Sequence, residues 1–244
     1  MRLPGHSHGG FRRGTSRRRN HPPLSRLIRN LTNDSLGRSA RAAGLLISSL
    51  AACFLIEAIL LPLAARADEG GPPVTILVTY HSGTGHTEKM ARGVVEGAKS
   101  VADTMVIVQQ VERVTADDLF SADALVVGSP VYWSNMAGPV KTFIDNWQFK
   151  FGVWPDLKLK NKVGAAFATG GQVSSGKELT MLAILAAMLG NQMIVVSGGG
   201  AFGASATTEG ESPGIDENEL AAAKELGRRV AEVTHLVVRG RSEP

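Results

Sequence analysis

Six consecutive residues, rich in glycine and hydroxyl groups, are suited to binding an anion. They are Ser82, Gly83, Thr84, Gly85, His86 and Thr87. The β-branched run Val74–Thr79 precedes them, and a pattern typical of an amphipathic helix follows over Thr87–Lys99. Between a strand and a helix, backbone N–H groups and the positive end of the helix dipole face a common point, and side-chain hydroxyls add donors. The residues therefore predict a phosphate-binding loop.

The composition of this loop restricts the phosphate it would bind. It lacks the G-x-G-x-x-G spacing of a dinucleotide site and the lysine of a P-loop. Since it contains no cationic side chain, neutral donors must hold the anion, which favours a monophosphate. We expect hydroxyl donation from Ser82, Thr84 and Thr87, with backbone N–H groups from the residues between them. The alternative is an ordinary strand-to-helix turn capped by Thr87.

Two later segments have a similar place in the chain, each directly after an apolar run. The first runs from Asp123 to Lys141 and contains Gly-Ser-Pro-Val-Tyr-Trp-Ser-Asn-Met. The second is Ala168–Gly171, followed by Ser175–Thr180. Because the carboxyl ends of parallel strands meet at one edge of a sheet, the three segments are expected to form one ligand site there.

The three segments together resemble a known superfamily. Ser-x-Thr-Gly-x-Thr after the first strand resembles the FMN-phosphate loop of the flavodoxins. The second segment is similar to the flavin-ring loop of the Trp-repressor-binding-protein type of NAD(P)H:quinone oxidoreductases and of flavodoxin-like FMN reductases, and the third resembles their next loop. The resemblance covers Val74 to Leu236. One departure is Tyr132-Trp133-Ser134, which stands where the quinone reductases have Arg-Phe-Gly.

The resemblance implies FMN as the cofactor and assigns residues to it. The second loop would lie beside the isoalloxazine, with an aromatic ring stacked on the flavin face and backbone amides at its pyrimidine edge. Simple packing is the alternative for its two aromatic residues. The third loop would border the flavin. The residues assigned to the second loop are Ser129, Pro130, Val131, Tyr132, Trp133, Asn135, Met136 and Gly138, and those assigned to the third are Thr169, Gly170 and Gly171.

The activity implied is an FMN-dependent oxidoreduction in which NAD(P)H passes a hydride to the flavin and the reduced flavin reduces a quinone or similar acceptor. The cofactor carries this chemistry, so no catalytic side chain and no metal are expected. The resemblance also implies a homo-oligomer. Two alternatives remain: an exported one-electron carrier of the flavodoxin type, and a cofactor-free interaction protein that kept the fold.

The first part of the chain differs in composition from the rest. Residues 1–41 carry ten Arg and one acid, which predicts a basic disordered leader. Residues 42–67 are almost purely apolar up to Ala65, which predicts a signal-peptide h-region or a membrane anchor, with lipidation at Cys53 as a third possibility. Residues 68–73 form a turn-rich linker. We expect export to the periplasm, free or anchored to the inner membrane, or a cytoplasmic protein if this segment does not direct targeting.

The basic overall charge belongs to that first part. Residues 68–244 contain 15 Lys and Arg against 20 Asp and Glu, a net charge of −5. A nucleic-acid partner is therefore not expected. The single cysteine, Cys53, lies before this region, so the domain from residue 74 to 244 has neither a disulfide nor thiol chemistry.

Apolar runs alternate with helical patterns along residues 74–244. Continuous rather than alternating apolar strands indicate a sheet buried on both faces. We therefore predict an α/β fold: a flavodoxin-like, doubly wound, five-stranded parallel sheet in the order 2-1-3-4-5, with helices on both faces. The expected strands are Val74–Thr79, Met105–Val111, Ala124–Gly128, Val163–Ala168 and Met193–Val196, and the expected helices are Thr87–Lys99, Thr115–Phe120, Pro139–Trp147, Lys177–Leu189 and Glu217–Val238, the last opened by an Asp216–Glu219 capping box.

Three further features allow more than one interpretation. The glycine-rich segment Gly198–Gly203 is either a mobile lid or a tight turn. Four aromatic residues, Trp147, Phe149, Phe151 and Trp154, suggest packing or a subunit contact. Three lysines, Lys158, Lys160 and Lys162, suggest an exposed approach to the fourth strand, and attraction of the NADPH phosphate is their alternative role.

Overall fold

The structure, a computed structural model, describes residues 72–208 and 215–242. The predictions for the leader, the apolar segment and residues 68–71 lie outside this part. The strands are β1 (Val74–Tyr80), β2 (Thr104–Gln110), β3 (Ala124–Tyr132), β4 (Asn135–Met136), β5 (Val163–Gly170), β6 (Ile194–Val195) and β7 (Ala204–Thr207). The α-helices are α2 (His86–Lys99), α3 (Ala116–Ser121), α4 (Gly138–Phe149), α5 (Lys177–Gly190) and α6 (Glu217–Ser242), with a 3₁₀ turn, η2, at Val111–Arg113.

The sheet has the predicted parallel topology. Its strands lie in the order β2-β1-β3-β5-β6, and each neighbouring pair is parallel. This order confirms the predicted 2-1-3-4-5, because β5 and β6 are the fourth and fifth parallel strands along the chain. The loops that leave the carboxyl ends of β1, β3 and β5 therefore emerge at the same edge, which we call the carboxyl edge.

The last strand differs from the prediction of one continuous run over Met193–Val196. Two residues, β6, pair with the start of β5, and the chain returns as β7 to pair with Phe167–Gly170. The glycine-rich segment between them forms a tight turn packed on α6: a side chain on Gly199 would lie 2.1 Å from the carbonyl oxygen of Ala222. Gly203 has a φ of 128° and approaches the carbonyl of Ala166 equally closely. Glycine is required at both points, because a Cβ would clash.

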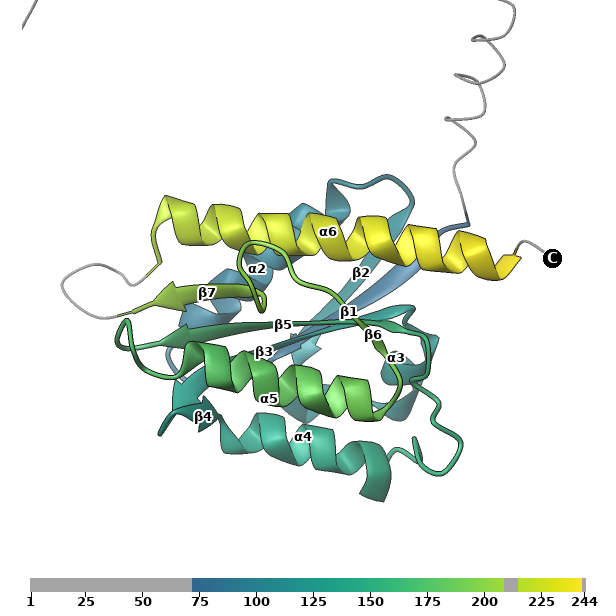
Figure 1. The fold of residues 1–244 in the computed structure, drawn as a ribbon, viewed down its shortest axis with the longest axis horizontal. Coiled ribbons are helices and arrows are strands. Elements are labelled where there is room, and N and C mark those ends of the chain that lie inside the picture. Colours follow the sequence, from purple (N-terminus) through teal and green to yellow (C-terminus); the bar gives the residue numbers. More distant parts are fainter. Residues whose placement is uncertain (1–71, 209–214, 243–244) are drawn as a thin grey trace, which may run out of the picture. The chain divides into compact units, whose positions relative to one another are not determined.

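Each face of the sheet is covered by helices (Figure 1). Alternate residues of β1 point to opposite faces, so Leu77 packs with α4 and α5, whereas Ile76 and Val78 pack with α2 and α6. The helices α2 and α6 approach each other closely at Gly227. A Cβ at this position would lie 1.9 Å from the carbonyl oxygen of Val94, so only glycine allows the contact.

The helix ends follow the local sequence signals. The predicted capping box at α6 is present: Glu219 N–H donates to the Asp216 carboxylate at 2.8 Å, and Asp216 N–H donates to the Glu219 carboxylate at 3.1 Å. Within residues 72–208 and 215–242, no helix is both long enough and apolar enough to cross a bilayer.

Candidate functional site

The three predicted loops lie together at the carboxyl edge of the sheet, where β1, β3 and β5 end. In Figure 1, β4 and the tip of β7 mark this edge, at the left of the molecule. The first loop joins β1 to α2, the second contains the β3–β4 hairpin, and the third joins β5 to α5. All seventeen residues that the sequence assigns to the cofactor belong to these loops or to the strand and helix ends beside them.

The first loop is shaped by the hydroxyl of Ser82. Its oxygen accepts the backbone N–H of Gly85 at 3.1 Å and that of Glu88 at 3.3 Å, so its proton remains available to an anion. Gly85 precedes α2 with a φ of 89°, a conformation that favours glycine. The N–H groups of His86 and Thr87, as the first residues of α2, have no partner inside the helix.

The other two hydroxyl-bearing residues of this loop differ in their exposure. Thr84 is exposed, and its hydroxyl lies 2.9 Å from the Nδ1 atom of His86. Thr87 is buried, and its hydroxyl lies 2.8 Å from that of Thr169 at the end of β5. The hydroxyl of Thr87 thus links the first loop to the third.

The second loop is a hairpin with an aromatic tip. Trp133 and Ser134, the two residues between β3 and β4, both have positive φ, 53° and 62°, the backbone conformation of a type I′ turn. Trp133 is fully exposed and Tyr132 is 48% exposed, so both rings are available to a ligand. Beside them, the rings of His81 and Tyr132 meet edge-on with centroids 6.5 Å apart, and His81 Nδ1 lies 2.6 Å from Glu112 Oε1.

Ser129 holds the base of this hairpin. The residue is fully buried within β3, where its hydroxyl donates to the Pro130 carbonyl at 2.8 Å and accepts the Ala137 N–H at 2.9 Å. These two bonds close residues 130–137 into a loop before α4 begins. The remaining predicted residues, Val131, Asn135, Met136 and Gly138, lie within or beside this loop.

The third loop is held by a lysine that the sequence reasoning did not assign to the site. Lys177 is 4% exposed, and its ammonium group donates to the carbonyls of Gln172 at 2.9 Å and Val173 at 3.2 Å and to the hydroxyl of Thr207 at 2.8 Å. It thereby fixes the loop that begins at Gly171 against β7. A lysine at the first position of a mostly apolar helix is the sequence signal that could have identified it.

Contacts between the loops close the site on three sides. Besides the bond between Thr87 and Thr169, the hydroxyl of Tyr132 lies 3.1 Å from the place where Gly83 would carry a Cβ. A Cβ on Gly176 would lie 2.8 Å from the Cα of Ser134, which joins the second loop to the third. Glycines at positions 83 and 176 therefore allow the loops to approach one another.

The donor set of the first loop fits the phosphate of FMN. It offers the hydroxyl of Ser82 and the free N–H groups at the start of α2, and the space beside Gly85 is open, so no side chain obstructs an anion there. The exposed rings of Tyr132 and Trp133 lie on the adjoining loop, where a flat ring system would follow the phosphate. Bound there, FMN would supply hydride acceptance and donation, and the three loops would hold and orient it.

Comparison with known proteins shows the family of this chain. A family model described as NADPH-dependent FMN reductase matches residues 110–208. An NAD(P)H dehydrogenase (quinone) of Geotalea daltonii is 32% identical over 207 residues, which covers 68% of this chain and 99% of the relative. NAD(P)H dehydrogenase (quinone) 3 of Rhizobium meliloti is 33% identical and covers 68% of this chain and 95% of its own length. This chain belongs to the NAD(P)H dehydrogenase (quinone) family.

Solved structures agree with this family assignment. A flavodoxin, WrbA-like protein from Agrobacterium tumefaciens superimposes with a TM-score of 0.57 at 26% identity, covering 67% of this chain and 98% of its own. A flavodoxin from the domain Archaea gives a TM-score of 0.52 at 25% identity, covering 66% of this chain and 98% of its own. The flavodoxin-like fold predicted from the sequence is thereby confirmed.

The opposite edge of the sheet, where the parallel strands begin, carries the three predicted lysines. Lys162 precedes the first residue of β5, and its ammonium group donates to the carbonyls of Phe120, at 2.7 Å, and Ala122. Burial lowers the pKa of Lys162, while the nearby Asp123 carboxylate opposes that shift. These lysines lie at the far end of the strands from the three loops, and Lys162 is half-buried rather than exposed as predicted. Attraction of the NADPH phosphate by these lysines stays a prediction.

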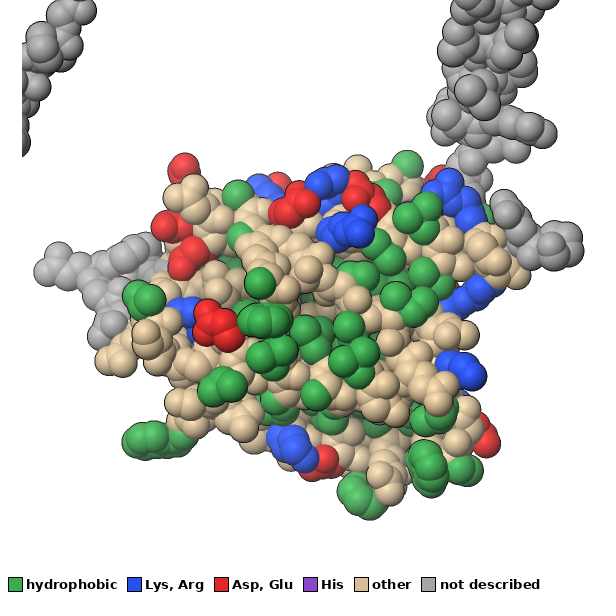
Figure 2. All heavy atoms as spheres, in the orientation of Figure 1, with side chains coloured by type: hydrophobic (Ala, Val, Ile, Leu, Met, Phe, Trp, Pro, Cys, Tyr) green, Lys and Arg blue, Asp and Glu red, His purple; other side chains and the backbone are tan. Residues whose placement is uncertain are grey.

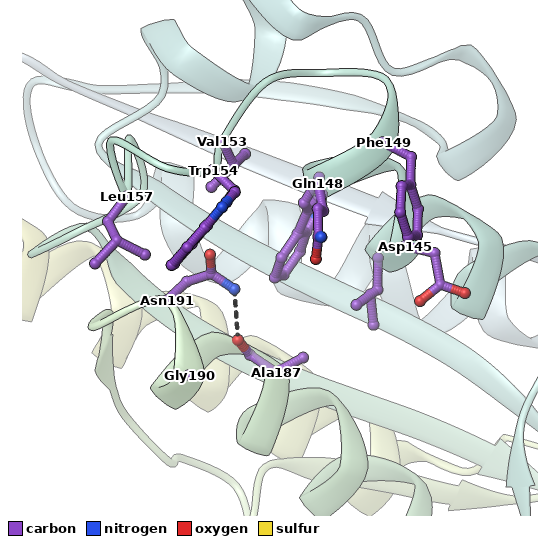
Figure 3. Close-up of a pocket in the computed structure, with 11 residues that line it drawn as sticks. Asp145, Gln148, Phe149, Val153, Trp154, Leu157, Ala187, Gly190 and Asn191 are labelled. Atoms are coloured by element: carbon purple, nitrogen blue, oxygen red, sulfur yellow. Dashed lines mark hydrogen bonds between the residues drawn. The ribbon is translucent and has the colours of Figure 1, made fainter.

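A cavity of about 350 Å³ also lies at this opposite edge (Figure 3). The ends of α4 and α5 and the connection between α4 and β5 enclose it. Figure 3 shows Trp154 between Leu157 and Asn191, with Phe149 on the far side of Gln148. Since it lies away from the three loops, this cavity is separate from the cofactor site.

Proposed function

We propose that this chain is an FMN-dependent NAD(P)H oxidoreductase that reduces a quinone or a similar acceptor. The observation that carries the proposal is the closed set of three loops at the carboxyl edge, in which a phosphate cradle of neutral donors adjoins two exposed aromatic rings. The names of the relatives, NAD(P)H dehydrogenase (quinone), support the choice of donor and acceptor.

Different residues bind the phosphate and the flavin ring. Ser82 and the first N–H groups of α2 bind the phosphate, because each lacks another acceptor for its proton. Tyr132 and Trp133 stack against or flank the ring, and Ser129 and Lys177 keep the second and third loops in position. With FMN held from these sides, donor and acceptor would use the remaining open face in turn.

The test is an anaerobic titration of the flavin-loaded protein with NADPH and with NADH, followed by addition of a soluble quinone. We expect loss of the flavin absorbance with at least one nucleotide and its recovery with the quinone. A protein that binds FMN but responds to neither nucleotide would overturn the proposal and favour the one-electron carrier. A protein that takes up no FMN would favour the cofactor-free alternative.

The homo-oligomer implied by the resemblance remains part of this proposal. The outward side of α5 supports it: Leu179, Leu182 and Leu189 are 61%, 40% and 56% exposed, and Phe202 beside them is 36% exposed. Leu182, Leu189 and Phe202 line one surface pocket, and Figure 2 shows apolar side chains gathered over α5 in the middle of the face in view. Light scattering should show a multimer for the wild-type protein and a smaller species for Leu182→Ser. A monomeric wild-type protein would refute the proposed homo-oligomer.

The assignment of the N-terminal segment as a signal peptide or membrane anchor is also proposed. Its support is the sequence: arginines over residues 1–41, then the apolar run to Ala65. Fractionation of cells expressing the full chain, with a size comparison against the full-length product, distinguishes the outcomes. A shortened periplasmic product indicates cleavage, a full-length membrane product indicates an anchor, and a full-length cytoplasmic product would refute targeting.

A further inference from the structure

Two aromatic residues at the edge opposite the flavin loops have no role in the core. Phe149, the last residue of α4, is 80% exposed, and Trp154 is 61% exposed, whereas their sequence neighbours Trp147 and Phe151 are buried. The packing interpretation therefore holds for the buried pair only. Both rings line the same cavity, so together they form an apolar surface that is available to a partner.

Exposed basic residues lie along the same edge of the sheet as these two rings. Lys150, Lys158 and Lys160 lie in the connection between α4 and β5, and Asp156 is its only exposed acid. The last turn of α6 adds Arg239 and Arg241, and the guanidinium of Arg241 donates to the carbonyl of Asn161 in the same connection. We call the set Phe149, Lys150, Trp154, Lys158, Lys160, Arg239 and Arg241 the basic edge.

The charge of the basic edge contrasts with that of the rest of the described domain. Among other described lysines and arginines, several are paired on the surface: Arg92 with Glu88, Lys141 with Asp145, Lys224 with Glu96, and Arg228 with Glu225 and Glu232. Among the residues that the structure describes, no such carboxylate pair involves the five cations of the basic edge; Lys150 and Lys158 instead lie over the rings of Phe151 and Phe120, at 5.7 Å and 5.0 Å from the centroids. Asp103 is an exposed acid on the same side of the sheet, in the turn between α2 and β2, and it is not part of the basic edge.

The start of the domain lies at this same side of the sheet. β1 begins at Val74, next to the carbonyl of Asp103, to which its N–H is bonded at 3.0 Å. The apolar segment ends at Ala65, so eight residues separate it from β1. An extended chain covers about 3.3–3.6 Å per residue, so these residues reach at most about 30 Å. A bilayer that held the apolar segment would therefore lie within reach of the sheet's starting edge.

From these observations we infer that the basic edge docks on a bilayer surface that contains anionic lipids. Tryptophan and phenylalanine partition into the interface between lipid and water, and lysine and arginine beside them attract anionic headgroups. The chain-length argument rests on the proposed membrane targeting; the aromatic and charge arguments do not. Docking in this way turns the carboxyl edge, with its flavin loops, away from the lipid.

The first experiment measures vesicle binding by residues 68–244 alone. This part folds without the leader, since residues from Glu69 form one compact unit and relatives match it over 95–99% of their own length. We expect sedimentation with vesicles of phosphatidylglycerol and phosphatidylcholine, and much weaker binding to phosphatidylcholine alone. K158Q/K160Q should bind about thirtyfold more weakly, because each surface cation contributes roughly fivefold to binding.

The matched control removes two cations from the outward side of α6, in K224Q/R228Q. Equal loss of binding in this control, or no binding by the wild-type fragment to either vesicle, would overturn the inference. Far-UV circular dichroism of each variant establishes that the fold is retained. Binding to a protein from solution, with no affinity for vesicles, would also overturn it and would assign the basic edge to a protein partner.

The second experiment uses the flavin-free full chain reconstituted in a bilayer with brominated lipid. Bromine quenches tryptophan emission on contact, and we expect the quenched part of the emission to disappear in W154F. If the full chain enters the bilayer but the emission of Trp154 is not quenched, the basic edge does not dock on the lipid, and the proposed membrane anchor is unaffected. If the fragment binds vesicles while the full chain stays soluble in cells, the proposed membrane anchor is wrong, but the inference that the basic edge binds anionic lipid is retained.

Discussion

Replacing Ser129 by alanine tests whether the β3–β4 hairpin forms one wall of the flavin site. The substitution removes the acceptor of the buried Ala137 N–H and the donor to the Pro130 carbonyl. An orphaned buried N–H costs about 1–3 kcal/mol, whereas a carbonyl with a second lone pair loses less. We expect a loss of about 2 kcal/mol in the free energy of unfolding. The melting temperature should fall by about 4–8 °C.

The same substitution should weaken FMN binding, because residues 130–137 would no longer be held in the binding conformation. Ordering a loosened segment on binding costs about 0.5–1.5 kcal/mol, which corresponds to a dissociation constant about two- to thirteenfold higher. Urea unfolding of the flavin-free protein measures the first effect. Quenching of FMN fluorescence on titration measures the second.

The matched control is Ser100→Ala. The hydroxyl of Ser100 donates to the Gly97 carbonyl at 2.6 Å at the end of α2, at the edge opposite the flavin loops. Its loss should cost about 0.5–1.5 kcal/mol of stability with no change in FMN affinity. If S129A loses stability but keeps its FMN dissociation constant, the hairpin is not part of the flavin site. If S129A keeps its stability, the two hydrogen bonds contribute nothing net, and the account of the loop is wrong.

Three further predictions concern other parts of the domain. Gly227→Ala places a methyl 1.9 Å from the carbonyl oxygen of Val94, so urea unfolding should show a loss of about 3 kcal/mol; a near-neutral result would contradict the close approach of α2 and α6. Trp133→Ala should leave stability within about 0.5 kcal/mol, because the ring is fully exposed. Its FMN affinity should fall about two- to tenfold in a fluorescence titration, and an unchanged value would exclude this ring from stacking. Hydrogen bonds from the Thr115 hydroxyl and N–H lower the pKa of Asp118, so the stability advantage of wild type over D118N is present at neutral pH and lost as pH falls below about 4. Unfolding at several pH values checks this, and an advantage that grew toward acid pH would refute the sign.

The fold was largely determined by local patterns in the sequence. The five parallel strands and five helices begin and end within a few residues of their predicted bounds, because apolar periodicity records which side of each element is buried. The loop that starts at Ser82 and the Asp216–Glu219 capping box are likewise short-range signals. The bonds to the Ser82 hydroxyl and the two reciprocal bonds of the capping box join residues at most six positions apart, so the local sequence determines them.

Tertiary structure decided the features that depend on residues far apart in the chain. The hydroxyls of Thr87 and Thr169 meet across 82 positions, and the Lys177 ammonium reaches Thr207 across 30. Likewise, only packing separates exposed Trp154 from buried Trp147, since nothing in their residue type does so. The turn before β7 also depends on a distant residue, because Gly203 packs against the carbonyl of Ala166 in β5, and the local sequence does not identify that partner. Local periodicity encodes which residues are buried, whereas the partners they meet are set by how the layers pack.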